Sequence, residues 1–267
     1  MRVETVGDGP AQIAVIGGIH GDEPCGVHAV ETLLDEDPEF QRAVKFVIAN
    51  ERAIEADTRY VDEDLNRAFP GDPDGDTHES RLAHRLGREV ADCQILALHS
   101  TQSYGGKFAL VDRVREFERR VCPHLSVDAV VETCDFTEGR LFEVSRRLVE
   151  VECGYQRSET AAENAVDITR EFLAATGALP ERVSAAADGG LEDRPIYRLA
   201  EPMPKVAADS YEVFATNFSR VAAGQTYAAA DEQEYVAEEP FYPVLLSAYG
   251  YEDVFGYSAD RVGTLDV

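Results

Sequence analysis

Positive charge is scarce in this sequence. Lysine and arginine together number 25, against 51 aspartates and glutamates, so the formal net charge at pH 7 is −26. Only three of the cations are lysines: Lys45, Lys107 and Lys205. A field of this sign repels nucleic acids and anionic membrane surfaces, because both carry dense negative charge. The composition therefore predicts that neither is a partner of this protein.

The scarcity of lysine beside many aspartates and arginines is also typical of proteins from salt-loving organisms. High salt screens the repulsion between like charges, which lets such a chain fold without balancing them. We therefore expect a halophilic source. Most of the acidic side chains are expected to form a solvated surface without a catalytic role.

Long apolar runs and paired cysteines are missing as well. No stretch approaches the roughly 18 consecutive apolar residues that would cross a bilayer. The first residues, MRVETVGDGPAQ, lack the basic start and apolar stretch of a signal peptide. The five cysteines form no CxxC pair, which argues against a disulfide framework and against a cysteine zinc site. We therefore expect a cytoplasmic protein.

At 267 residues, the chain is long enough for one large domain or a catalytic domain with an appendage, and 44% hydrophobic residues are enough to bury a substantial core. Short apolar runs alternate with amphipathic segments over the first two thirds, as in an α/β sheet. Asp76 and Glu79 predict a capping-box start for one helix. The expected strands cover residues 12–16, 45–49, 94–98, 107–111, 127–132 and 149–153, and the expected helices cover 24–34, 76–90 and 159–176.

The texture changes near the end of the last of these helices. Residues 178–194 are rich in Ala, Gly, Pro and Asp, and the segments that follow are short, β-like and separated by Pro and Gly. We therefore predict a catalytic domain over residues 1–180 and a small β-rich C-terminal unit over 186–267.

The first chemical signal is the stretch AVIGGIHGDEPCG, in which a strand ends in two glycines before His20 and Glu23. At this spacing, an imidazole and a carboxylate can converge on one metal ion, and zinc accepts both. The glycines allow a tight turn at the carboxyl edge of the sheet, where open α/β folds place their ligands. An H-x-x-E pair also arises by chance in turns and helices.

A catalytic zinc site needs a third protein ligand and a position open to water. His99, in QILALHSTQS, ends another apolar strand and is the best candidate among the remaining histidines. The alternative is a hydrogen-bonded histidine at a strand terminus.

Two further segments have the chemistry of a substrate site. In TRYVDEDLNRAFPG, Arg59, Asn66 and Arg67 offer donors that fit a carboxylate. The neighbouring acids at 62–64 could equally pair with these arginines in a surface network. In LVEVECG, Glu150 and Glu152 share one face of a strand. Glu152, at the strand end, is either a general base next to the metal or an edge residue facing solvent.

These motifs occur in an order that resembles the succinylglutamate desuccinylase/aspartoacylase family, a branch of the zinc carboxypeptidase superfamily. The similar segments are GIHGDE, DLNR, LHST and VEVECG within residues 13–154, with a weaker likeness in EPFYPVLLSAYGYEDVFGY near the C-terminus. The resemblance implies an α/β fold with a zinc-carboxypeptidase-like mixed sheet flanked by helices. It also implies that the β-rich C-terminal unit caps the site.

The resemblance assigns roles residue by residue. His20, Glu23 and His99 would hold one zinc ion, and Glu152 would transfer the protons. Arg59 would stabilise the oxyanion of the tetrahedral intermediate. Asn66 and Arg67 would bind a substrate carboxylate.

The sequence leaves some assignments open. The family's pocket tyrosine corresponds to Tyr249 or Tyr251. Its further arginine has no unambiguous match among Arg140, Arg146 and Arg147. The family often has an acidic residue two positions before the third zinc ligand, where this chain has Ala97.

The reaction implied is hydrolysis of the acyl amide bond of a small N-acyl amino acid by a water molecule activated at zinc. Two alternatives stay open: a carboxypeptidase-like metallopeptidase, and a member that binds a metal or carboxylate without catalysis. The expected partner is the small-molecule substrate, and a homo-oligomer is possible.

Overall fold

The computed structural model describes residues 1–134, 136–180 and 193–265. In spatial order, the main ten-stranded sheet contains β1 (Arg2–Val6), β3 (Val44–Ile48), β2 (Ile13–Gly17), β4 (Gln94–Thr101), β7 (Leu148–Tyr155), β5 (Phe108–Val111), β6 (Ala129–Glu132), β8 (Arg194–Pro204), β13 (Val254–Leu265) and β12 (Tyr242–Val244). A second sheet contains β11 (Gln233–Val236), β10 (Thr226–Ala230) and β9 (Tyr211–Val213). The helices are α1 (Cys25–Glu36), α2 (Glu51–Ala56), α3 (His78–Val90), α4 (Glu116–Val121) and α5 (Glu159–Ala175), with 3-10 turns η1 (Leu65–Arg67), η2 (Cys122–His124) and η3 (Leu141–Glu143). The predicted fold class, a mixed sheet flanked by helices with a β-rich C-terminal unit, is confirmed.

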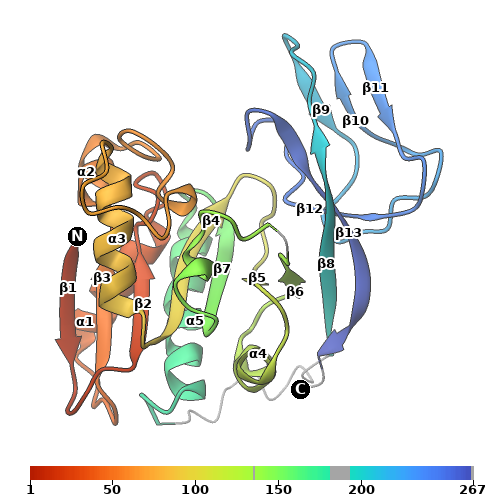
Figure 1. The fold of residues 1–267 in the computed structure, drawn as a ribbon. Helices are drawn as coiled ribbons and strands as arrows, with labels where there is room; N and C mark the ends of the chain where they lie inside the picture. Colours follow the sequence, from red (N-terminus) through yellow and green to blue (C-terminus); the bar gives the residue numbers. More distant parts are fainter. Residues whose placement is uncertain (135, 181–192, 266–267) are drawn as a thin grey trace.

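The centre of the main sheet is parallel, with β2 between β3 and β4, and β7 next to β4. Helices α1 and α5 pack on one face and α3 on the other (Figure 1). Every residue of β2 and β4 is buried, as expected for parallel strands covered on both faces. This explains why these strands read as continuous apolar runs in the sequence.

The C-terminal residues extend the main sheet before they form their own. Strand β8 pairs in parallel with β6, and β13 and β12 follow at the edge. The sheet of β9–β11 projects beyond this edge, at the upper right of Figure 1. The predicted boundary at 178–194 falls mostly on residues 181–192, outside the described residues, so the division into two domains stays a prediction.

The predicted capping box at the start of α3 is wrong. The N-cap is Thr77, whose side chain accepts a hydrogen bond from the N–H of Ser80. Glu79 turns away from this helix end, because its carboxylate accepts hydrogen bonds from the backbone of residues 61–63. Strand β1 has no counterpart among the predicted elements. It pairs antiparallel with β3 at the edge of the sheet and is mostly exposed.

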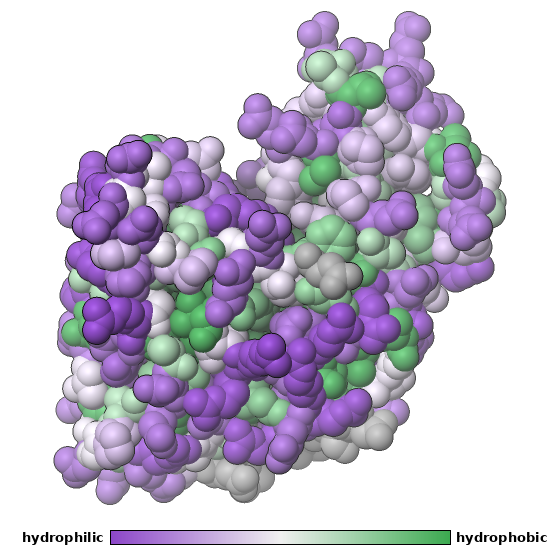
Figure 2. All heavy atoms as spheres, in the orientation of Figure 1, coloured by the Kyte–Doolittle hydropathy of each residue, from purple (hydrophilic) through white to green (hydrophobic). Residues whose placement is uncertain are grey.

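The surface is strongly polar. Hydrophilic side chains cover most of the face shown in Figure 2, as the excess of charged residues predicts. Among the described helices, none is long and apolar enough to cross a membrane. All five cysteines are buried and have free thiols.

Candidate metal and catalytic site

The site lies at the carboxyl edge of the central parallel strands. His20 and Glu23 follow β2, and His99 and Glu152 lie near the ends of β4 and β7, where they are paired in register. The end of β2 needs glycine, since a Cβ atom at Gly17 would lie 2.3 Å from the backbone of helix α1. The parallel topology therefore brings three distant segments to one place.

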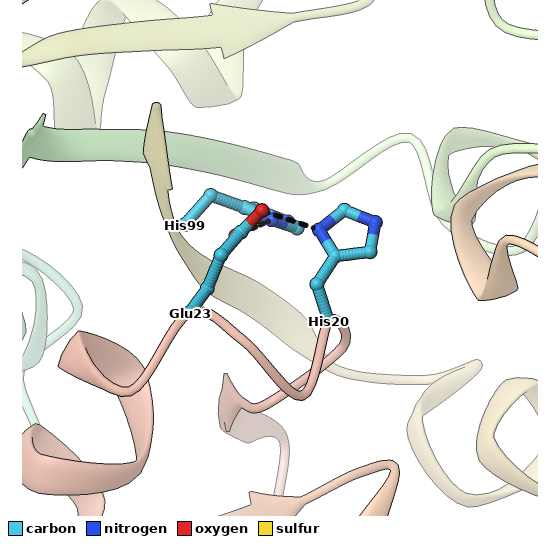
Figure 3. A group of neighbouring side chains, drawn as sticks. All are labelled: His20, Glu23 and His99. Carbon is cyan, nitrogen blue, oxygen red and sulfur yellow. Dashed lines mark hydrogen bonds and ion pairs between the residues drawn. The ribbon is translucent and has the colours of Figure 1, made fainter. Parts of the chain in front are cut away.

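His20, Glu23 and His99 converge as the sequence predicted (Figure 3). Nδ1 of His20 donates to Oε1 of Glu23 at 2.8 Å, and Nδ1 of His99 donates to Oε2 at 3.0 Å. One potential ligand atom from each residue lies within 4.8 Å of the others, and all three residues are buried. Among the described residues, this is the group of His, Cys, Asp and Glu side chains placed to hold a metal ion.

The donor set fits zinc. Two imidazole nitrogens and one carboxylate are common ligands of catalytic zinc and leave a fourth position open. Burial alone would lower the pKa of the His99 imidazole, but the hydrogen bond and charge of Glu23 raise that pKa to about 9. The neighbouring imidazoles hold the pKa of the Glu23 carboxyl well below its usual range despite its burial. The carboxylate thus remains ionised and available as a ligand.

Asp64 supports this group, a role that the sequence analysis did not assign. Its Oδ1 accepts from Nε2 of His20 at 3.0 Å, and its Oδ2 accepts from the guanidinium of Arg59 at 3.1 Å. Arg59 also donates to Oε1 of Glu23 at 3.0 Å. A carboxylate on the second ring nitrogen fixes the tautomer and orientation of a ligating histidine. The DLNR motif contains Asp64, but its contact with His20 joins residues 44 positions apart.

Glu152 lines the same pocket. Its Oε2 is buried without a hydrogen-bond partner, and burial, together with the negative charge of Glu23, raises its pKa to about 7. Glu150, two residues earlier, is 1% exposed and faces the pocket as well. It pairs in register with Ala97, so a neighbouring strand brings a carboxylate beside the position where the resembled family has its acidic residue.

Asn66 is placed between segments of the site wall. Its Nδ2 donates to Glu150 at 3.2 Å, and its Oδ1 accepts from the N–H of Leu141 at 3.1 Å. Asn66 is 5% exposed and lines the pocket. Its side chain therefore joins the DLNR turn to β7 and to the loop that carries Arg140.

Arg67 and Arg140 form a cationic wall of the pocket. Burial lowers the pKa of Arg67, and the charge of Arg140 lowers it further. Within the described part of the chain, neither guanidinium forms an ion pair with a carboxylate. Arg146 and Arg147 are exposed outside the pocket, and the Arg147 guanidinium donates to the carbonyl of residue 92. Of the three arginines left open, the structure brings Arg140 to the site.

The structure also separates the two candidate tyrosines. Tyr251 lines the pocket, whereas Tyr249 is 64% exposed and accepts a hydrogen bond from the N–H of Tyr211. Lys205 holds the loop between them, because its ammonium group donates to the carbonyls of Ala248 and Tyr251 at 2.7 Å each.

The remaining wall of the pocket is polar and without formal cations. Gln156 donates to the carbonyl of Asp22 at 3.0 Å and accepts from Gln102 at 3.3 Å. In the described residues, four buried polar atoms without a hydrogen-bond partner belong to side chains lining this pocket: Asp22 Oδ1, His99 Nε2, Ser100 Oγ and Glu152 Oε2. Such atoms are costly to bury, so their concentration here marks a place for polar ligand groups.

Comparison with known sequences identifies a family to which this chain is similar. A model of the succinylglutamate desuccinylase/aspartoacylase catalytic domain matches residues 10–176. N-acyl-aromatic-L-amino acid amidohydrolase (carboxylate-forming) of Rattus norvegicus is 34% identical over 135 residues, which cover 43% of this chain and 42% of the relative. Aspartoacylase of Rattus norvegicus is 49% identical over 61 residues, which cover 22% of this chain and 20% of the relative. The matched parts span less than half the length of these curated relatives.

Solved structures share the fold. Succinylglutamatedesuccinylase/aspartoacylase from Rhodobacter sphaeroides has a TM-score of 0.77 at 20% identity, with 98% of this chain and 89% of that one covered. Murine aminoacylase 3 has a TM-score of 0.76 at 20% identity, with 97% and 98% covered. The family model spans more than half of the sequence, and we therefore conclude that this chain belongs to the succinylglutamate desuccinylase/aspartoacylase family.

Proposed function

We propose that this protein is a zinc-dependent amidohydrolase that cleaves the acyl amide bond of a small N-acyl amino acid. The products are a carboxylic acid and a free amino acid. The observation that carries the proposal is the convergence of His20, Glu23 and His99 beside Glu152, in a chain that belongs to this family.

His20, Glu23 and His99 are the residues that would hold the ion. When bound, zinc polarises a carbonyl group and lowers the pKa of a water molecule. Glu152 supplies the proton transfers, because a pKa near neutrality suits a group that must both accept and return a proton. It takes a proton from the attacking water and delivers it to the nitrogen of the leaving amine.

We assign to Arg59 the stabilisation of negative charge on the acyl oxygen. Its guanidinium lines the pocket, and its bonds to Glu23 and Asp64 fix its orientation before substrate arrives. A donor that is held in advance at the developing oxyanion stabilises the transition state by on the order of 3 kcal/mol.

Arg67 and Arg140 bind a carboxylate of the substrate. Two guanidiniums in one wall can hold a carboxylate by bidentate hydrogen bonds, and their charges reverse the negative field of the protein locally. Tyr251, beside them in the pocket, contributes a hydroxyl group at the same end. The polar wall of Gln102 and Gln156 accommodates an uncharged part of the substrate.

Metal analysis of the purified protein, coupled to a screen of N-acyl amino acids for released amine, tests this proposal. We expect one zinc ion per chain and turnover of at least one anionic N-acyl amino acid. Short peptides in the same screen separate an acylase from a carboxypeptidase. Glu152→Gln should lose turnover by roughly 100-fold or more and keep its zinc. Unchanged turnover in this variant would exclude Glu152 as the base, and absence of stoichiometric zinc would exclude the metal site.

A further inference from the structure

Glu79 is a buried acid outside the pocket. It lies in the first turn of α3 and is 0% exposed. Its Oε1 accepts from the N–H of Val61 at 2.8 Å and from Nδ2 of Asn50 at 3.0 Å. Its Oε2 accepts from the N–H of Asp62 at 3.0 Å, and from that of residue 63 at 3.4 Å. Three successive backbone amides thus point at one carboxylate.

Residues 61–63 in turn supply a carboxylate to the start of α3. Oδ2 of Asp62 accepts from the N–H of His78 at 2.7 Å, and the hydroxyl group of Thr77 donates to Glu63. Negative charge near the first turn of a helix is favoured by the exposed N–H groups there. The start of α3 and residues 61–63 are therefore joined by reciprocal hydrogen bonds.

Residues 61–63 lie between two residues of the site. Arg59 precedes it by two positions and Asp64 follows it directly. These two side chains are hydrogen-bonded to each other. Arg59 also donates to Glu23, and Asp64 accepts from His20, so both contact the metal-ligand group. Any shift of residues 61–63 must move Arg59 or Asp64, because a chain this short has no slack.

We propose that Glu79 is a positioning residue for the loop of residues 59–64, setting Arg59 against the reacting carbonyl and Asp64 against His20. This inference rests on the proposed function for its consequence on catalysis. Its structural part, the order of residues 61–63, does not.

Glu79→Gln tests it most directly. The amide keeps the length of the side chain but has one acceptor oxygen, and its NH₂ group faces N–H donors of the loop. In the zinc-loaded protein we expect the backbone amides of residues 61–63 to exchange with solvent at least about tenfold faster. We expect kcat to fall by roughly 10- to 100-fold, with a smaller change in KM. Glu79→Asp, which keeps the charge but is one methylene shorter, should show the same pattern and serves if the Gln variant does not fold.

Leu173→Ala is the matched control for lost stability. Leu173 is fully buried on α5, on the opposite face of the sheet from α3. Assayed well below its unfolding temperature, this variant should keep kcat and the exchange rates of residues 61–63.

A double-mutant cycle with Arg59→Ala separates positioning from a general effect. Because Arg59, which Glu79 positions, is then absent, the fold-loss in kcat of the double variant should be well below the product of the fold-losses of the two single variants. Multiplying losses, unchanged exchange at residues 61–63, or a kcat loss no larger than that of Leu173→Ala would overturn the inference. If the wild-type protein hydrolyses no N-acyl amino acid, the proposed function fails, and the exchange measurement still decides whether Glu79 orders the loop.

Discussion

Two walls of the pocket differ in whether their charged groups are paired. In the paired wall, His20, Glu23, His99, Arg59 and Asp64 are joined by hydrogen bonds, so each charge has an opposite partner near 3 Å. In the unpaired wall, Arg67 and Arg140 have no ion pair within the described residues, and Oε2 of Glu152 has no hydrogen-bond partner. A chain with 51 acidic residues does not lack carboxylates. We interpret the paired wall as a fixed framework and the unpaired wall as the surface that substrate completes.

Breaking the paired wall should have the largest effect. We expect His99→Ala to lose stoichiometric zinc and with it all turnover above background, because two remaining ligands cannot hold a catalytic ion tightly. Metal analysis after gel filtration measures this. His28→Ala is the control, since His28 is exposed on α1 and should leave the zinc content unchanged. Full zinc content in His99→Ala would show that the framework is not a metal site.

Removing a cation from the unpaired wall should weaken substrate binding without unfolding the protein. We expect Arg140→Ala to raise KM by roughly 10- to 100-fold, the loss of a charged hydrogen bond of about 2 kcal/mol. Its stability should not fall through lost ion pairing, because Arg140 forms no ion pair with a carboxylate among the described residues. Steady-state kinetics and thermal unfolding measure both. An equal KM for Arg140→Ala and the exposed control Arg147→Ala would remove Arg140 from the site.

In the metal-free protein, the unpaired carboxyl group of Glu152 should make the folding stability depend on pH. Its pKa is raised from about 4.5 in the unfolded chain to about 7 in the fold, so the protonated form favours folding. That contribution is complete below about pH 4.5 and is lost as the pH rises through about 7. We therefore expect Glu152→Gln to be more stable than wild type near pH 8.5, by on the order of 2 kcal/mol. Denaturant titrations at both ends of this pH range test the sign. A variant that is less stable at alkaline pH would contradict the assigned shift.

The smallest effect should come from the anchor of the tyrosine loop. Lys205→Met keeps an apolar stem but loses both bonds to the carbonyls of Ala248 and Tyr251. We expect KM to rise by roughly three- to tenfold, since the loop that carries Tyr251 loses two hydrogen bonds. Val206→Ala, at an exposed neighbouring position, is the control and should leave KM unchanged. Equal kinetics for Lys205→Met and this control would show that the loop is held by other contacts.

Much of this molecule follows from local sequence. Continuous apolar runs predict β2 and β4, because strands buried on both faces must be apolar throughout. His20, Glu23 and His99 each follow or end such a run, and parallel strands bring their carboxyl ends to one edge. The convergence of these three residues could therefore be predicted. The capping box was predicted wrongly at Glu79, because a local rule has no knowledge of the loop at residues 61–63.

The sequence by itself determined the fold class, since strand periodicity is a property of neighbouring residues. It singled out the three potential metal ligands and Glu152 only through the resemblance of its ordered motifs to the family. Only the tertiary structure decided that Arg140 rather than Arg147, and Tyr251 rather than Tyr249, reaches the pocket. It alone joined Asp64 to His20. These choices depend on hydrogen bonds and burial between segments far apart in the chain, which spacing along the chain does not encode.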